Sequence, residues 1–164
     1  MPISSQGYGG NVMEHARPTQ TPAEDTGGRR SALTVQALMT PNVVTLEQHQ
    51  PIQEAINLFA GREFRHIPVV DGDRLVGVLS DRDALRAFAR SQDYSTPIRT
   101  IMRADPHRVQ THTPVVEAIK LLLEHRINCL PVVAEQEILV GILTTTDLLH
   151  ALLQLHESTA SLPA

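Results

Sequence analysis

Apolar positions along the chain mark four helices in two similar pairs. Two stretches place apolar residues at i, i+3, i+4 and i+7, which is one face of an α-helix: Ile52, Ala55, Ile56 and Phe59, and then Val115, Ala118, Ile119 and Leu122. A proline precedes each stretch, as suits a first helical turn. Two further helices are expected to start at Ser80 and Thr144. Their apolar residues are Ala84, Leu85 and Phe88 in one and Leu148, Leu149 and Leu152 in the other.

Short apolar runs between the helices predict strands. In the first half, the helix at Ile52 follows a short β segment at 43–46 and precedes two apolar runs at 66–70 and 75–79. In the second half, the helix at Val115 follows a β segment at 107–110 and precedes runs at 129–133 and 138–143. The segment Asp71-Gly72-Asp73 between two of these runs is typical of a hairpin. The predicted order is therefore β-α-β-β-α, twice.

The two halves are copies of one unit. A single shift of the chain superposes Met39 on Met102 and Pro68-Val69-Val70 on Pro131-Val132-Val133, and after one insertion Asp83 superposes on Asp147. A unit of this size is too small to be stable alone. We expect an α/β (α+β) fold in which two βαββα repeats pack with pseudo-twofold symmetry and leave ligand-sized clefts between them.

The repeats divide the chain into four parts. Residues 1–31 are rich in Gly, Pro, Ser and Thr without an apolar period, which predicts a disordered tail, or one that becomes ordered against a partner. Repeat 1 is expected at 32–95, repeat 2 at 96–157 with its last helix ending at His156, and a C-terminal tail at 158–164. We expect no further domain after repeat 2, and therefore a module that acts on another chain.

Composition narrows the function classes. The net charge of −4 and the 3% of aromatic residues argue against binding nucleic acid through its backbone or bases, although they do not exclude a local basic pocket. The single cysteine, Cys129, excludes an internal disulfide and favours a reducing compartment. No apolar run reaches the roughly 18 residues of a membrane span, and no signal peptide is visible. These features predict a cytoplasmic protein with no membrane association.

Each repeat carries one motif that suits either of two roles. Residues 77–83 and 141–147 both read Gly, two apolar residues, a hydroxyl residue, two spacers and Asp, at a strand end that leads into a helix. A hydroxyl residue with an acidic residue three positions on resembles a capping box. The same helix start would favour a phosphate, its Asp could accept hydrogen bonds from ribose hydroxyls, and its glycine could let a ligand approach the backbone.

From about Val35 to His156 the chain resembles a tandem pair of CBS domains, or Bateman module. The motifs that carry the resemblance are Met39-Thr40-Pro41, His66 to Asp71 and Leu75 to Asp83, and in the second repeat Ile101-Met102-Arg103, Leu130 to Val133 and Leu139 to Asp147. The resemblance implies a regulatory module that requires no cofactor and binds AMP, ADP, ATP, S-adenosylmethionine or NAD(H).

The resemblance also implies roles for individual residues. Asp83 and Asp147 would hold ribose, Ser80 and Thr144 would face ribose or phosphate, and Arg82 and Thr146 would face phosphate. Adenine would lie against two sets of segments. The first set consists of the segment Thr40 to Val44, which includes Val43, together with His66, Ile67 and Pro68. The second set consists of the segment Arg103 to His107 together with Cys129, Leu130 and Pro131. The first site, with Arg82 and nearby Arg65, suits a phosphorylated ligand better than the more neutral second site.

Other functions have weaker support in the sequence. No nucleophile–base pair, phosphate loop or metal-binding motif is visible, so we expect neither an enzyme nor a metal site. The main expectation is a homodimer that senses an adenosine-type ligand and signals to an unknown protein target. The alternatives are a ligand-free protein–protein adaptor and a metal or redox sensor using Cys129, for which a buried inert thiol is the simpler interpretation.

Overall fold

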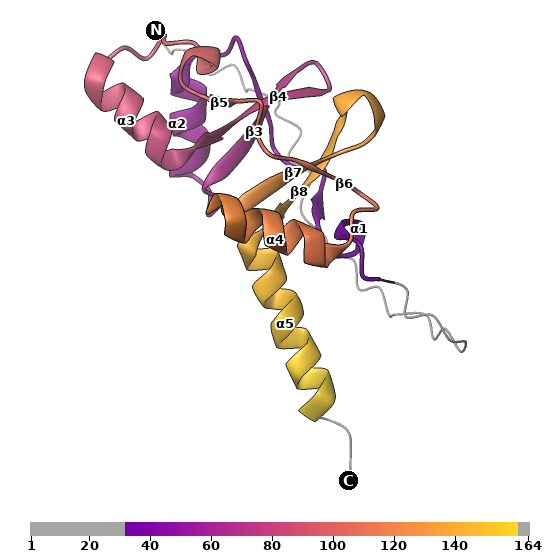
Figure 1. Cartoon of the computed structure of the whole chain (residues 1–164). Coiled ribbons are helices and arrows are strands. Elements are labelled where there is room, and N and C mark those ends of the chain that lie inside the picture. Colours follow the sequence, from indigo (N-terminus) through magenta and orange to yellow (C-terminus); the bar gives the residue numbers. More distant parts are fainter. Residues whose placement is uncertain (1–31, 161–164) are drawn as a thin grey trace, which may run out of the picture. The chain divides into compact units, whose positions relative to one another are not determined.

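Two four-stranded sheets and the helices that follow their strands form the part of the chain that the structure describes (Figure 1). The structure is a computed structural model and describes residues 32–160, which belong to a single compact unit. The first sheet has the order β2 (Leu46–Glu47), β3 (His66–Asp71), β4 (Arg74–Ser80) and β5 (Arg103–Ala104). The second has the order β6 (Val109–Gln110), β7 (Cys129–Val133), β8 (Leu139–Thr144) and β1 (Thr40–Pro41).

The helices occupy matching places in the two halves. They are α1 (Val35–Leu38), α2 (Ile52–Ala60), α3 (Asp81–Ser91), α4 (Val115–His125) and α5 (Thr145–Ala160), with short 3₁₀ turns η1 (Ile98–Thr100) and η2 (Glu135–Glu137). The predicted β-α-β-β-α order is confirmed in both repeats, and equivalent strands follow the same order in the two sheets. The fold class predicted from the sequence is therefore correct.

The segment that leads into each repeat packs on the sheet of the other repeat. β1 pairs antiparallel with β8, where Thr40 lies opposite Ile142, and β5 pairs antiparallel with β4, where Arg103 lies opposite Val78. Sequence analysis treated 32–95 and 96–157 as separate blocks and did not predict this exchange.

Backbone hydrogen bonds repeat the exchange at equivalent positions. The N–H of Val35 donates to the Thr113 carbonyl at 2.9 Å, and the N–H of Ile98 donates to the Gln50 carbonyl at 2.9 Å. Each donor belongs to a leading segment, and each acceptor belongs to the loop before the first helix of the other repeat. The two repeats are therefore tied together by backbone pairing as well as by side-chain packing.

Two apolar cores lie between the sheets and their helices. One contains Leu46, Ala55, Ile67, Val69, Leu79, Ala84 and Ile98; the other contains Val35, Val109, Ala118, Leu122, Leu130, Val132 and Leu143. Each core thus includes one residue from an exchanged segment, Ile98 or Val35. A smaller cluster of Val78, Cys129 and Ile142, with Val43 packed against it, joins the two repeats.

The glycine of each motif makes room for the exchanged segment. A Cβ atom on Gly77 would lie 2.5 Å from the Sδ of Met102, and one on Gly141 would lie 2.7 Å from the Thr40 carbonyl oxygen and 3.1 Å from the Sδ of Met39. The expectation that these glycines admit a ligand is therefore wrong. The space beside each glycine is filled by a methionine and a strand of the leading segment.

The first predicted strand of each repeat is shorter than expected. Asn42 and Asp105 occupy equivalent positions and both have left-handed backbone, with φ of 51° and 46°. This turn bends the chain between the exchanged strand and the repeat's own sheet, so Val43 and Val44 are not in a strand, and β6 does not begin until Val109.

The last helix is longer than expected and continues to Ala160 rather than ending at His156. In Figure 1, α5 runs well past the sheet that it follows. The predicted tail at 1–31, and residues 161–164 of the predicted C-terminal tail, lie outside the described residues. Between residues 32 and 160, no helix has both the length and the hydropathy that a membrane crossing requires.

Candidate functional site

A cleft of about 180 Å³ lies between the two repeats and is lined by both. From repeat 1 it takes His66, Val78, Ser80 and Asp83; from the leading segment and body of repeat 2 it takes Arg103, Pro106, His107, Arg126, Ile127, Asn128, Cys129 and Pro131. Seven of these are sequence-predicted site residues: His66, Ser80, Asp83, Arg103, His107, Cys129 and Pro131. The exchange of β5 onto β4 explains why residues so far apart in the chain line one cleft.

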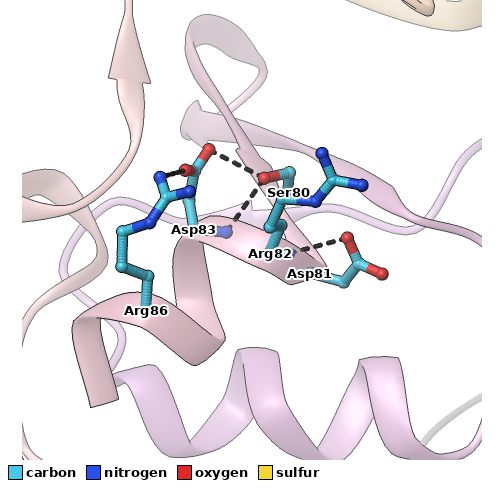
Figure 2. A network of polar contacts seen from close by, with 5 residues as sticks. All are labelled: Ser80, Asp81, Arg82, Asp83 and Arg86. Carbon is cyan, nitrogen blue, oxygen red and sulfur yellow. Dashed lines mark hydrogen bonds and ion pairs between the residues drawn. The ribbon is translucent and has the colours of Figure 1, made fainter. Parts of the chain in front are cut away.

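The start of α3 supplies the polar edge of this cleft. Ser80 is the N-cap of α3: its Oγ accepts a hydrogen bond from the Asp83 N–H at 3.0 Å and donates to Asp83 Oδ2 at 2.7 Å. Arg86 donates to Asp83 Oδ1 at 3.2 Å, as Figure 2 shows. The Asp83 side chain remains 45% exposed, so its carboxylate can still accept hydrogen bonds from outside the protein. The capping role and the ligand role are therefore compatible at Asp83.

The start of α5 has a more complete capping box. Asp147 Oδ2 accepts hydrogen bonds from the Thr144 N–H at 2.7 Å and from Thr144 Oγ1 at 2.6 Å. The Thr144 Oγ1 accepts in turn from the Asp147 N–H at 3.3 Å, and Thr40 Oγ1 donates to Asp147 Oδ1 at 3.4 Å. Thr40 thus lies beside Asp147 of the other repeat, whereas the resemblance grouped it with His66.

The remaining predicted residues lie away from the cleft. Ile67 and Leu130 have fully buried side chains within the two cores, because alternate strand residues face the helices. They could meet a ligand only through their backbone. Pro68 is also fully buried, and Val43, Val44, Thr144, Thr146 and Asp147 do not line this cleft.

Arg82 does not line the cleft either. It is one of the residues around a separate groove that also includes Ile56 and Phe59 of α2. Figure 2 shows the guanidinium groups of Arg82 and Arg86 on opposite sides of the helix start. Arg65, the second cation that sequence analysis assigned to this site, lies 3.8 Å from the carboxylate of Asp81. The arginines expected to favour phosphate are therefore not the ones that line the cleft.

His66 and Cys129 occupy equivalent positions in the two repeats, and burial shifts the pKa of each in the direction that favours its neutral form. Burial lowers the pKa of His66 below its ordinary value of 6.5, an effect that the carboxylates of Asp81 and Asp83 partly offset. Burial also raises the pKa of the Cys129 thiol to about 11. Among residues 32–160 no cluster of three or more His, Cys, Asp or Glu side chains could hold a metal ion.

Comparison with known proteins identifies the family. The family model described as "CBS domain" matches residues 35–90 and 98–154, which together make up more than half of the chain. The chain belongs to the CBS domain family. Its two matched segments make it a CBS pair.

Several relatives are of similar size. The CBS domain-containing protein YhcV of Bacillus subtilis is 37% identical over 116 residues, which cover 70% of this chain and 82% of that protein. AcuB from Vibrio cholerae has a TM-score of 0.72 at 32% identity and is matched over 80% of this chain and 99% of its own. The CBSX2 protein of Arabidopsis thaliana, solved in complex with AMP, has a TM-score of 0.67 at 30% identity over 75% of this chain and 98% of that one. Other relatives are longer enzymes of which this chain spans less than a third.

Four residues of the CBS-pair cleft were not predicted from the sequence: Val78, Arg126, Ile127 and Asn128. Pro106 lies within the segment Arg103 to His107, which the resemblance placed against adenine. Val78 lies inside the Gly-to-Asp motif, and its place opposite Arg103 follows only from the exchanged strand pairing. Arg126 to Asn128 directly precede the Cys129-Leu130-Pro131 segment. Extending that segment toward the end of α4 would have included them.

Proposed function

We propose that this CBS pair is a non-enzymatic regulatory protein that binds an adenosine-type ligand in the cleft between its repeats. The observation that carries the proposal is the meeting of Asp83 and Ser80 of one repeat with Arg103, His107 and Cys129 of the other in one cleft. Asp83 would accept hydrogen bonds from ribose hydroxyls, and the Pro131 and Val78 side chains would contact the base. The AMP found in the CBSX2 structure supports this class of ligand.

Binding in this cleft would couple the ligand to the packing of the repeats. The cleft residues come from β3, β4 and α3 on one side and from the exchanged β5 and the α4–β7 connection on the other. A ligand that contacts both sides would stabilise one arrangement of the two repeats over others. The output would pass to a protein target in the cytoplasm, without a membrane or nucleic acid.

The second part of the proposal is a homodimer. The helices of repeat 2 expose large apolar side chains at helical spacing: Val116 and Leu123 on α4, and Leu149, Leu152 and Leu153 on α5, each at least 55% exposed. Apolar surface of this kind is typical of protein–protein contacts. A second copy of the chain would cover this surface, leaving the cleft between repeats accessible.

The test is calorimetric titration with AMP, ATP, S-adenosylmethionine and NADH at concentrations up to millimolar. We expect at least one of these compounds to bind. Asp83→Ala should weaken that binding by about tenfold or more, because the variant lacks the carboxylate that would accept two hydrogen bonds from the ribose. Asp73→Ala makes the same charge change at an exposed hairpin and should leave the affinity unchanged. Thermal unfolding of both variants checks that the fold is retained.

The rival function is an adaptor whose cleft stays empty. It predicts no heat and no thermal shift with any of the four compounds, together with a dimer whose sedimentation is unaffected by them. That combination would contradict the sensor proposal.

A further inference from the structure

The positive charge of the cleft comes from two arginines of repeat 2. Arg103 and Arg126 both line the cleft. Within the described part of the chain, neither guanidinium forms a side-chain hydrogen bond or ion pair, whereas Arg86 and Arg108 are paired with aspartates. Two arginines that line one cavity without a side-chain partner among the described residues are suited to binding an anion.

The backbone holds both arginines at the edge of the cleft. Arg103 belongs to β5 and is fixed by its pairing opposite Val78. Arg126 is the C-cap of α4 with a left-handed backbone, φ 52°, and its N–H donates to the carbonyls of Leu122 and Leu123. Their Cα positions therefore do not depend on a ligand, and only the long side chains must be ordered when an anion binds.

A stacked pair of imidazoles lies beside Arg126. The ring of His107, which lines the cleft, stacks on that of His125 with centroids 3.7 Å apart and an interplanar angle of 17°. The stack holds the His107 ring, which can donate or accept a hydrogen bond, at this side of the cleft. Asp83 is the only acidic residue among those lining the cleft, and Arg86 is hydrogen-bonded to its carboxylate.

The two positions equivalent to these arginines carry no positive charge in the other half. Arg65, which is equivalent to Asn128, lies 3.8 Å from the carboxylate of Asp81. In the alignment that superposes Met39 on Met102, Arg103 corresponds to Thr40 and Arg126 corresponds to Glu63. The Thr40 hydroxyl donates to Asp147. A site built around Asp147 would therefore offer an anion neither of the two guanidinium groups.

We propose that Arg103 and Arg126 bind the phosphate of the ligand, so that the cleft selects anionic adenosine nucleotides over uncharged adenosine and cationic S-adenosylmethionine, with one such nucleotide bound per chain. This inference rests on the proposed function, because it assumes that an adenosine moiety occupies the cleft. It assigns the selectivity to arginines of repeat 2 rather than to Arg82 or Arg65 of repeat 1.

The test is titration of the full-length protein with AMP, adenosine and S-adenosylmethionine at one ionic strength. AMP is expected to bind at least tenfold more tightly than adenosine, with a stoichiometry of one. Arg126→Gln and Arg103→Gln are each expected to weaken AMP binding about tenfold and to leave adenosine binding unchanged, since a charge-assisted hydrogen bond contributes only when the phosphate is present. Added salt should weaken AMP binding more than adenosine binding.

Two control variants make the result specific. Arg90→Gln removes the same charge from the far end of α3, away from the cleft, and should not change AMP binding. Arg126→Lys keeps the charge but loses the planar guanidinium, so it should retain more AMP affinity than Arg126→Gln. A thermal melt of each variant reports whether it is folded.

The ways in which the proposal can fail are distinguishable. Equal affinity for AMP and adenosine, or an Arg126→Gln variant that weakens both to the same extent, would overturn the selectivity while leaving the adenosine site in place. Tighter binding of S-adenosylmethionine than of AMP would overturn it as well. If no adenosine compound binds, the proposed function fails, and this inference fails with it.

Discussion

The two repeats have the same backbone plan but differ in the side chains around their helix starts. Both use a glycine beside a methionine of the exchanged segment, a hydroxyl N-cap, and an aspartate three residues later. Around Asp83, the neighbouring cations are Arg86 and the cleft arginines. Around Asp147, the neighbours are the Thr144 and Thr40 hydroxyls. The shared motif residues are therefore accounted for by folding, whereas under the proposed function the ligand preference would depend on residues outside the motif.

His66 and Cys129 also differ in chemistry although they occupy equivalent positions, each at the start of the second strand of its repeat. Both side chains line the cleft, and burial shifts both pKa values in the direction that keeps the group neutral. A neutral imidazole can still donate and accept hydrogen bonds, while a protonated thiol does so only weakly. The equivalent positions therefore give the two halves different polar character without adding charge.

The largest expected effect concerns the reactivity of Cys129. With its pKa raised to about 11 from 9.0, the thiol should have about a hundredfold less thiolate at pH 8 than the thiol of the unfolded chain. Alkylation by iodoacetamide at pH 8 should therefore be at least about a hundredfold slower in the native protein than in urea. The chain has a single cysteine, so the measured rate belongs to this residue. Similar rates in the two states would revive the redox-sensor alternative.

The next effect compares how closely the exchanged segment packs against the motif glycine in each half. In Gly141→Ala the new methyl group would meet the backbone oxygen of Thr40, whereas in Gly77→Ala the nearest atom belongs to the flexible side chain of Met102. We expect Gly141→Ala to lower the free energy of unfolding by about 2 kcal/mol and Gly77→Ala by about 1 kcal/mol. Urea-induced unfolding measures both.

Gly61→Ala is the matched control for these two variants. A Cβ at Gly61 has no neighbour closer than 3.8 Å, so its free energy of unfolding should stay within about 0.5 kcal/mol of the original. A Gly141→Ala protein as stable as the Gly61→Ala protein would contradict the packing of β1 against β8.

The smallest effect concerns the pH dependence of stability. Because the folded pKa of His66 is below the unfolded value of 6.5, the unfolded chain takes up this proton first as the pH falls. The contribution of neutral His66 is therefore present above about pH 6.5 and is lost as the pH falls below it. The side chain is partly exposed, so solvent screening keeps the loss small.

Replacing His66 with Gln should remove this part of the pH dependence, which unfolding curves at pH 5 and pH 7.5 would measure. His112→Gln, at an exposed loop position, should leave the difference between the two pH values as it is in the original protein. A difference that is unchanged in His66→Gln would show that burial does not affect this imidazole.

Local signals in the sequence determined most of the fold. The helical spacing around Ile52 and Val115, the hairpin at Gly72 and the helix starts at Ser80 and Thr144 were predicted correctly, since each depends on residues within a few positions of one another. The offset between matching motifs, which changes only at one insertion, established that the chain is a duplication. The same motifs placed Ser80, Asp83 and His66 among the candidate ligand residues that the cleft brings together.

Only the tertiary structure decided which segments belong to which sheet and which arginines line the cleft. β1 and β5 are too short to show an alternating pattern, and the strands that they pair with belong to the other repeat, far away in the chain. Arg82 directly precedes Asp83, and Arg65 directly precedes His66, but neither arginine lines the cleft. Arg103 and Arg126 do line it, through the exchanged segment and the end of α4. Strand pairing over such distances leaves no local periodicity, so the charge of the cleft could not be predicted from the motif that marks it.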